Sequence, residues 1–208
     1  MKILAEKEAE EFLEKEGFPV SNRLITRDLH ACLKYAKKKG YPVALKIVSP
    51  SIIHKSDIGG VKLDLRNEHE LKRAFVDIMS IREAEAVMIE PFTVGTYLLL
   101  GIKKDQTFGH AVAVGWGGIH TEILKDVSLR VCPIDEKEAL NMLKELKVYS
   151  LINGYRGEKP ADIKKITKII SKLSNLPEKY HKLAELDINP MIVSSRETRI
   201  VDARIVFD

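Results

Sequence analysis

The chain has 208 residues, of which 45% are hydrophobic and 31% charged, and its formal net charge is +4. This length and composition indicate a globular protein with a sizeable core. Basic and acidic residues are interspersed, which argues against nucleic-acid binding, and no apolar run reaches the roughly 18–20 residues that cross a bilayer, so we expect a cytoplasmic protein.

The first half of the chain alternates between helical and strand-like patterns. An amphipathic helix is predicted from Lys2 to Lys15, where Gly17 and Pro19 end the pattern. A second helical pattern closes at Gly40, with lysines in its last turn. The remaining predictions for this half are strands at residues 21–27, 42–48, 59–65 and 85–92, and helices at residues 28–39 and 67–84.

The second half is richer in short strands separated by turn residues. Strands are predicted at residues 96–105, 110–118, 120–134, 185–193 and 198–207, and helices near residues 136–146 and 162–173. This order predicts an α+β fold with largely antiparallel sheets in two lobes, residues 1–90 and residues 91–208. A cleft between two lobes is a common place for a nucleotide.

The stretch ALKIVSPSIIHKSDIGGVKL contains the first group of candidate functional residues. Lys46 lies in an apolar strand and must find an anion or a path to water, because burying an unpaired cation is costly. Gly59 and Gly60 allow close backbone approach, and their amides can form an anion nest. Considered one at a time, Lys46 fits a solvated edge strand, the two glycines fit a hairpin, and His54 fits a surface histidine. Together they predict a phosphate site with a nucleophilic imidazole.

The stretch GWGGIHTEILKDVSLR, residues 115–130, is the second group. Its glycines give a turn flexible enough to follow a ligand, and charged residues of alternating sign come just after them. The alternative is a hairpin with a solvated polar face, and the spacing does not match the dinucleotide-binding fingerprint. The residues concerned are Gly115, Gly117, Gly118, Glu122, Lys125, Asp126 and Arg130.

The third group lies near the end of the chain, in ELDINP and VDARI. Glu185, Asp187 and Asn189 recur at period two, so all three point to one face of a strand. Asp202 belongs to the next predicted strand, which we expect to pair with the first. Clustered oxygen donors suit Mg²⁺, which takes one or two protein oxygens together with phosphates and water. A solvent-facing polar strand is the alternative.

These blocks, together with INGYRGEKPAD, occur in the same order in ADP-forming acyl-CoA synthetases. Over nearly its whole length the sequence resembles the beta subunits of ADP-forming acetyl-CoA synthetases, which are ATP-grasp proteins related to the succinyl-CoA synthetase beta subunit. The resemblance implies an ATP-grasp fold with a nucleotide cleft between two α+β lobes. It also implies the reaction acyl-CoA + ADP + phosphate ⇌ acid + CoA + ATP.

The resemblance further implies individual roles. His54 would be a phosphohistidine that carries a phosphoryl group from an alpha subunit to ADP, Lys46 would pair the nucleotide phosphates, and the loop with Gly59 and Gly60 would cover them. The other implied residues are Glu90, Pro91 and Phe92 for the nucleotide, and Asn189, Asp202 and, as a third candidate, Asp187 for Mg²⁺. The implied partners are ATP/ADP and a CoA-binding alpha subunit, in a heterotetramer of two alpha and two beta chains.

One departure from the family pattern concerns Tyr97, because family members usually carry a glutamate at this place, near the nucleotide side of the sheet. The choice between ADP and GDP is left open by this change. Two alternative functions also stay open. One is an ATP-grasp carboxylate–amine ligase, which would need no histidine in its phosphate loop. The other is a non-catalytic subunit that binds a nucleotide to regulate an alpha subunit.

Overall fold

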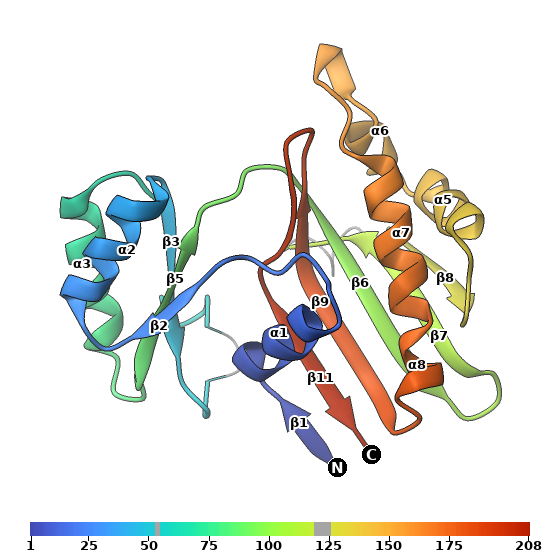
Figure 1. Ribbon diagram of the computed structural model, residues 1–208, viewed down its shortest axis with the longest axis horizontal. Coiled ribbons are helices and arrows are strands. Elements are labelled where there is room, and N and C mark those ends of the chain that lie inside the picture. Colours follow the sequence, from blue (N-terminus) through green and yellow to red (C-terminus); the bar gives the residue numbers. More distant parts are fainter. Residues whose placement is uncertain (53–54, 119–125) are drawn as a thin grey trace. The chain divides into compact units, whose positions relative to one another are not determined.

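The structure is a computed structural model that describes residues 1–52, 55–118 and 126–208. The chain forms two compact units (Figure 1). Ser21–Thr93 make up the smaller unit, whereas Met1–Val20 and Val94–Asp208 together make up the larger unit. Both units combine helices with antiparallel strands, which confirms the predicted α+β class.

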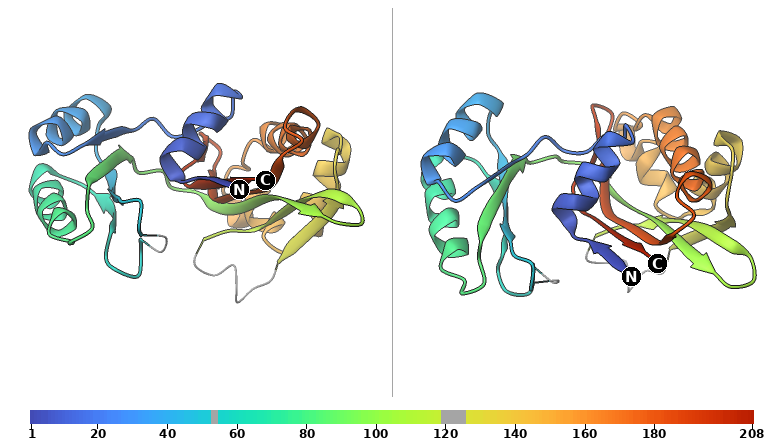
Figure 2. Two further views of the ribbon diagram at one scale, coloured as in Figure 1. Left: turned by 90° about the horizontal axis from the view of Figure 1, so that it is seen from below. Right: turned by 60° about the horizontal axis from the view of Figure 1, so that its bottom comes forward.

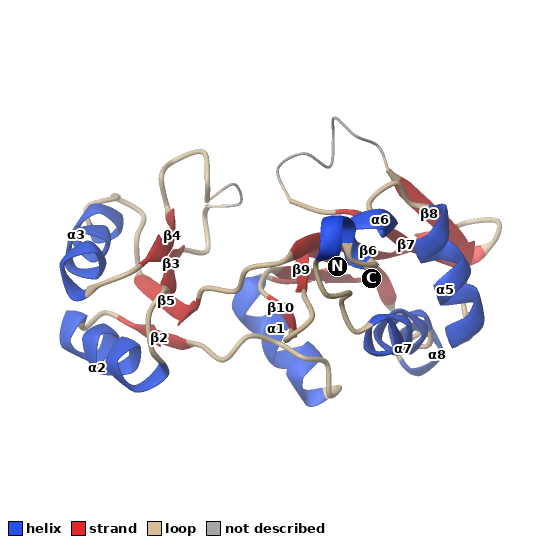
Figure 3. Ribbon diagram, turned by 90° about the horizontal axis from the view of Figure 1, so that it is seen from above, coloured by secondary structure: helices blue, strands red, loops and turns tan. Residues whose placement is uncertain are grey.

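The smaller unit is a four-stranded antiparallel sheet with the strand order β2-β5-β3-β4. Its two long helices, α2 and α3, lie on the same side of this sheet (Figure 3). Apolar side chains from both helices and from the strands form one buried cluster between them. The elements are β2 (Leu24–Thr26), α2 (Leu29–Lys39), β3 (Val43–Val48), β4 (Val61–Leu65), α3 (Glu68–Met79) and β5 (Ala86–Pro91).

The ends of these helices follow the expected chemistry. The Asp28 side chain accepts a hydrogen bond from the His30 amide at the start of α2, and Asn67 accepts one from the Glu70 amide at the start of α3. Helix α2 ends at Gly40, whose φ of 92° is one that glycine adopts without strain. The predicted helix at residues 28–39 is therefore confirmed, whereas α3 ends at Met79, before the predicted end at residue 84.

The larger unit is built on a seven-stranded sheet with the order β1-β11-β9-β6-β7-β8, and β10 pairs with β9 beside this path. Its strands are β1 (Lys2–Leu4), β6 (Thr96–Asp105), β7 (Gly109–Trp116), β8 (Val127–Val131), β9 (Leu183–Val193), β10 (Thr198–Ile200) and β11 (Ala203–Phe207). Its helical segments are α1 (Glu6–Lys15), α5 (Glu136–Glu145), α6 (Tyr149–Ile152), η1 (Tyr155–Gly157), α7 (Ile163–Ser174) and α8 (Leu176–Lys179).

One face of this sheet carries the core of the larger unit. In β6, Leu98, Leu100 and Ile102 are buried and belong to one apolar cluster with residues of α1, α5 and α7. These helices are seen beside the sheet in Figure 2. The alternate residues of β6, such as Gly101 and Lys103, are more exposed. The other sheet face carries the alternate side chains, which include the exposed Leu129 and Val131 of β8, and the candidate residues of β9 lie on it.

The beginning of the chain differs from its prediction. Residues Lys2–Leu4 form strand β1, which pairs with β11, and the helix begins only at Glu6. Residues 1–20 consequently group with the C-terminal part of the chain, unlike the predicted lobe of residues 1–90. The reason is that Ala9 and Leu13 of α1 are buried in the core of the larger unit. None of the helices that the structure describes is both long and apolar enough to span a bilayer.

Candidate functional site

In the smaller unit, a buried ion pair joins two of the predicted nucleotide-binding residues. Lys46 Nζ in β3 lies 2.7 Å from Glu90 Oε1 in β5, and their side chains are only 9% and 2% exposed. The two strands are paired so that Lys46 lies opposite Met88 and Ala44 opposite Glu90. Glu90 is therefore an anion of the kind that Lys46 was predicted to need. Strand β3 is a central strand with neighbours on both sides, so it is not a solvated edge strand.

The surroundings of Glu90 carry further polar features. Glu90 Oε2 is buried and accepts no hydrogen bond in the part of the chain that the structure describes. Burial, and secondarily the charge of Glu90, raise the pKa of Tyr35 to about 12. Pro91 lies opposite Val43, and the amide of Phe92 donates to the carbonyl of Pro42. The buried carboxylate thus has acceptor capacity for a donor on a ligand.

The loop that connects β3 to β4 contains the predicted glycines. The amide of Gly59 donates to Ser56 O, and the amide of Gly60 donates to Lys55 O, so both close the loop on itself. A Cβ atom on Gly60 would lie 2.6 Å from Ile47 Cγ2, which explains why no larger residue fits there. His54 belongs to this loop but lies outside the described residues.

In the larger unit, the predicted magnesium residues come together at the junction of β9 and β11. The amide of Asn189 donates to the carbonyl of Asp202. Asp187 and Asn189 alternate with buried Leu186 and Ile188, as the period-two pattern predicts. The run from Thr198 to Phe207, predicted as one strand, is two strands, and Asp202 lies between them.

The donor set at this junction fits Mg²⁺. Burial, followed by the charges of Asp202 and Glu185, raises the pKa of Asp187 to about 6. Among the described residues, no group of three or more His, Cys, Asp or Glu side chains could hold a metal ion by itself. Asn189 and the neighbouring carboxylates suit a hard cation that keeps phosphate and water as its other ligands.

The glycine turn at residues 115–118 is bound to this junction, which the sequence did not predict. The amide of Gly117 donates to Tyr97 O, and the amide of Gly118 donates to Asn189 Oδ1 at 2.7 Å. A Cβ atom on Gly117 would lie 2.6 Å from the carbonyl carbon of Leu98, so the turn lies directly on the backbone of β6. The turn therefore contacts a candidate metal ligand.

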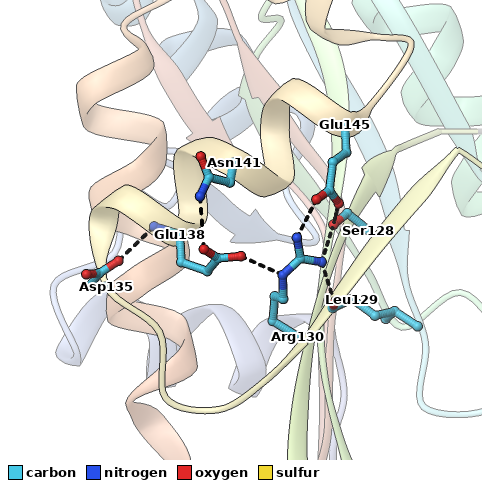
Figure 4. A network of polar contacts seen from close by, with 7 residues as sticks. All are labelled: Ser128, Leu129, Arg130, Asp135, Glu138, Asn141 and Glu145. Carbon is cyan, nitrogen blue, oxygen red and sulfur yellow. Dashed lines mark hydrogen bonds and ion pairs between the residues drawn. The ribbon is translucent and has the colours of Figure 1, made fainter.

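The charged residues after this turn have structural roles where they are described. Asp126 accepts hydrogen bonds from the amides of Lys147 and Val148. Figure 4 shows Arg130 of β8 contacting Glu138 and Glu145 of α5. These residues hold the helical segments against the sheet. The predicted Glu122 and Lys125 lie outside the described residues.

Replacing Arg130 with glutamine is expected to lower the urea midpoint at pH 7 and to have little effect in acid. Hydrogen bonds from Arg130 lower the pKa values of Glu138 and Glu145. Carboxylates with lowered folded-state pKa values stabilise the fold above their unfolded pKa of about 4.3, and this contribution is lost as the pH falls through the folded value.

Urea titrations of both proteins at pH 7 and pH 3 test this expectation, with the exposed Arg196→Gln, in the turn between β9 and β10, as a control. A gap between wild type and Arg130→Gln that persists unchanged at pH 3 would contradict the assigned role.

The chain matches the family model described as an ATP-grasp domain over residues 1–207. It is 40% identical over 211 residues to the beta subunit of acetate–CoA ligase (ADP-forming) I of Pyrococcus furiosus, covering 98% of this chain and 91% of the relative. It is also 40% identical to the 4-hydroxybutyrate–CoA ligase (ADP-forming) of Nitrosopumilus maritimus, but spans only 30% of that longer protein.

Solved structures give the same answer for the fold. The dinucleotide-forming acetyl-coenzyme A synthetase 1 of Ca. Korarchaeum cryptofilum, in complex with coenzyme A and Ca-AMPCP, has a TM-score of 0.90 at 37% identity, covering 100% of this chain and 94% of that chain. A second structure of that protein, with coenzyme A and Mg-AMPPCP, has a TM-score of 0.85 at 38% identity, covering 100% of this chain and 93% of that chain. Its phosphohistidine segment points towards the nucleotide-binding site.

Proposed function

Since this chain belongs to the ATP-grasp domain family and is similar to ADP-forming acetate–CoA ligase beta subunits, we propose that it is the nucleotide-binding beta subunit of an ADP-forming acyl-CoA synthetase. In this role it makes ATP from ADP and a phosphoryl group that derives from inorganic phosphate. The overall reaction is acyl-CoA + ADP + phosphate ⇌ acid + CoA + ATP.

The buried Lys46–Glu90 pair is the observation that carries the proposal. Lys46, which is 7% exposed as a whole residue, lies on a central strand, and burying its charge costs free energy. The ion pair with Glu90 fixes the ammonium group in one place. Phosphoryl transfer depends on positioning and charge neutralisation more than on covalent chemistry. Lys46 therefore pairs the nucleotide phosphates, while Glu90 and the backbone of Pro91 and Phe92 hold the base.

His54 is proposed to relay the phosphoryl group. A neutral imidazole nitrogen of His54 attacks the phosphorus atom of the phosphohistidine on the alpha subunit, and the phosphorus–nitrogen bond of the donor breaks. In this step His54 gives up its ring proton, and the leaving imidazole of the donor takes up one proton, so that the transfer balances. A terminal phosphate oxygen of ADP then attacks the same phosphorus, and His54 leaves as neutral imidazole after taking up a proton. The loop between β3 and β4 is a suitable carrier because loops can move between two sites.

Mg²⁺ is proposed to be held by Asn189 and Asp202, with Asp187 as the third candidate. When bound, it neutralises charge on the nucleotide phosphates. The chain's own contribution is to fix the amide oxygen of Asn189 through the Gly118 amide, and to bring Asp202 beside it through the backbone contact between β9 and the segment before β11.

A CoA-binding alpha subunit is the proposed partner, in a heterotetramer of two alpha and two beta chains. Both the beta-subunit naming of the Pyrococcus furiosus relative and the longer Nitrosopumilus maritimus relative support a second functional part outside this chain. Binding of CoA and formation of the acyl phosphate are assigned to that partner.

Incubation with γ-labelled ATP and Mg²⁺ tests the relay directly. We expect a base-stable, acid-labile label on the wild-type chain, because phosphoramidates are hydrolysed in acid. The label should be absent from His54→Ala and present in His69→Ala, which changes an exposed histidine of α3 in the same unit.

The same variants are assayed after reconstitution with the alpha subunit. We expect His54→Ala to abolish acyl-CoA-dependent ATP synthesis. A label or an undiminished synthesis rate in His54→Ala would exclude the relay. If the wild-type chain binds ATP but never becomes labelled, with or without the partner, the carboxylate–amine ligase or the regulatory subunit becomes the better reading.

A further inference from the structure

Tyr97 and the glycine turn at residues 117–118 are in close contact in the larger unit. The carbonyl of Tyr97 accepts a hydrogen bond from the Gly117 amide at 2.9 Å, one residue beyond the Leu98–Trp116 pair of the β6–β7 ladder. A Cβ atom on Gly118 would lie 2.7 Å from Tyr97 Cδ2 and 3.6 Å from Cε2. The tyrosine ring therefore lies against the α-carbon of Gly118.

The backbone of Gly118 has a conformation that residues other than glycine rarely adopt, and glycine by itself would hold this conformation only loosely. Its φ is 83°, in the left-handed region, and glycine has the largest conformational freedom to lose on folding. A flat ring on one side of the α-carbon, and the hydrogen bond of Gly117 just before it, restrict this freedom. The direction of the Gly118 N–H is fixed as a result.

That N–H group points to the side chain of Asn189. It donates to Asn189 Oδ1 at 2.7 Å, which determines which end of the amide group is the oxygen at this position. An amide oxygen has two lone pairs, so this bond leaves a second one for a cation. The chain of contacts therefore runs from the Tyr97 ring through Gly118 to the oxygen that is a candidate magnesium ligand.

We propose that Tyr97 is a positioning residue for Mg²⁺, acting through Gly118 on the orientation of the Asn189 amide oxygen. This inference rests on the proposed role of Asn189 as a metal ligand. Residues that orient a metal ligand typically change metal affinity by about 10- to 100-fold when they are replaced, without touching the ion themselves. The ring acts by packing, so its hydroxyl group is dispensable.

Calorimetry of ADP binding, with Mg²⁺ and with EDTA, tests the proposal. The quantity compared is the gain in ADP affinity that Mg²⁺ produces. Tyr97→Ala is expected to reduce this gain by about tenfold or more, with metal-free affinity unchanged. Tyr97→Phe should keep the gain, as should Tyr155→Ala, which removes an exposed tyrosine of the same unit.

A second variant and a second readout guard against simple unfolding. Tyr97→Leu keeps apolar volume in β6 but removes the flat ring, and it should lose the gain as Tyr97→Ala does. Hydrogen exchange at the Gly118 amide should accelerate in both variants and remain slow in Tyr97→Phe.

The outcomes separate this inference from the proposed function. If wild-type protein shows the magnesium-dependent gain and folded Tyr97→Ala or Tyr97→Leu keeps it in full, the positioning role is wrong and the metal assignment stands. If the wild-type protein binds ADP equally well with Mg²⁺ and with EDTA, the metal assignment itself is overturned, and the inference falls with it.

Discussion

Replacing Lys46 with methionine is expected to lower the free energy of unfolding by about 3–5 kcal/mol and to abolish measurable ADP binding. The loss of stability arises because the carboxylate of Glu90, whose side chain is only 2% exposed, would stay buried without its cation. The loss of binding arises because the nucleotide phosphates would lose their proposed positive partner. Urea titration measures the first effect and calorimetry with ADP the second.

The double variant Lys46→Met, Glu90→Met separates these two effects. A buried ion pair can often be replaced by apolar side chains of similar volume with little or no loss of stability. The double variant should therefore regain most of the unfolding free energy and still fail to bind ADP. ADP binding by the double variant would show that the pair is structural only.

Lys62→Met serves as the matched control for the lysine change. Lys62 lies in the neighbouring strand β4, is about one-third exposed and is 4.0 Å from Asp77. Pairs of this kind contribute about 0–1 kcal/mol, so the variant should be nearly as stable as the wild type and bind ADP normally. A destabilisation equal to that of Lys46→Met would indicate that the loss of any lysine from this sheet is harmful.

The need of Lys46 for an anion was predictable, whereas the identity of the anion was not. The cost of burying an ammonium group follows from the apolar residues around Lys46 in the sequence. Glu90 becomes its partner only through the pairing of β3 with β5, and strand β4 and helix α3 lie between these two strands in the sequence. Register of this kind is set by tertiary packing.

The first strand was missed for a related reason. Lys2–Leu4 precede the continuous helical pattern of α1 without any turn residue, so the pattern predicted one helix from Lys2. Three residues are too few to show a period of two. Their strand conformation depends on β11, at the other end of the chain. Contacts between the two ends leave no local pattern in the sequence.

At the candidate metal site, the positions of residues within one strand were predictable from the sequence, whereas the contacts between distant segments were not. The period of two correctly placed Asp187 and Asn189 on one face of β9, between buried neighbours. By contrast, the contact of Asn189 with Gly118, and that of Gly118 with Tyr97, bring together three separate segments of the chain. The glycines of the turn were singled out in the sequence, but only the folded chain shows which side chain they contact.

Replacing either Asn189 or Asp202 with alanine is expected to reduce the magnesium-dependent gain in ADP affinity by about 100-fold. This value lies at the upper end of the range for residues that merely orient a ligand, and a direct ligand should lose at least as much. Asp187→Ala should reduce this gain by less, since Asp187 is proposed as the weakest of the three ligands. Calorimetry with Mg²⁺ and with EDTA measures the gain for each variant.

Glu185→Ala is the matched control, since Glu185 lies on the same face of β9, opposite Lys103 of β6 and four residues before Asn189. It removes an acidic residue from the same strand and should leave the gain intact. A graded series, with Asn189 and Asp202 largest, Asp187 intermediate and Glu185 near zero, would locate the ion at the junction of β9 and β11. An equal loss in all four variants would instead indicate a general effect of negative charge on this sheet face, because a coordinated ion depends on particular oxygen atoms whereas a diffuse electrostatic field does not.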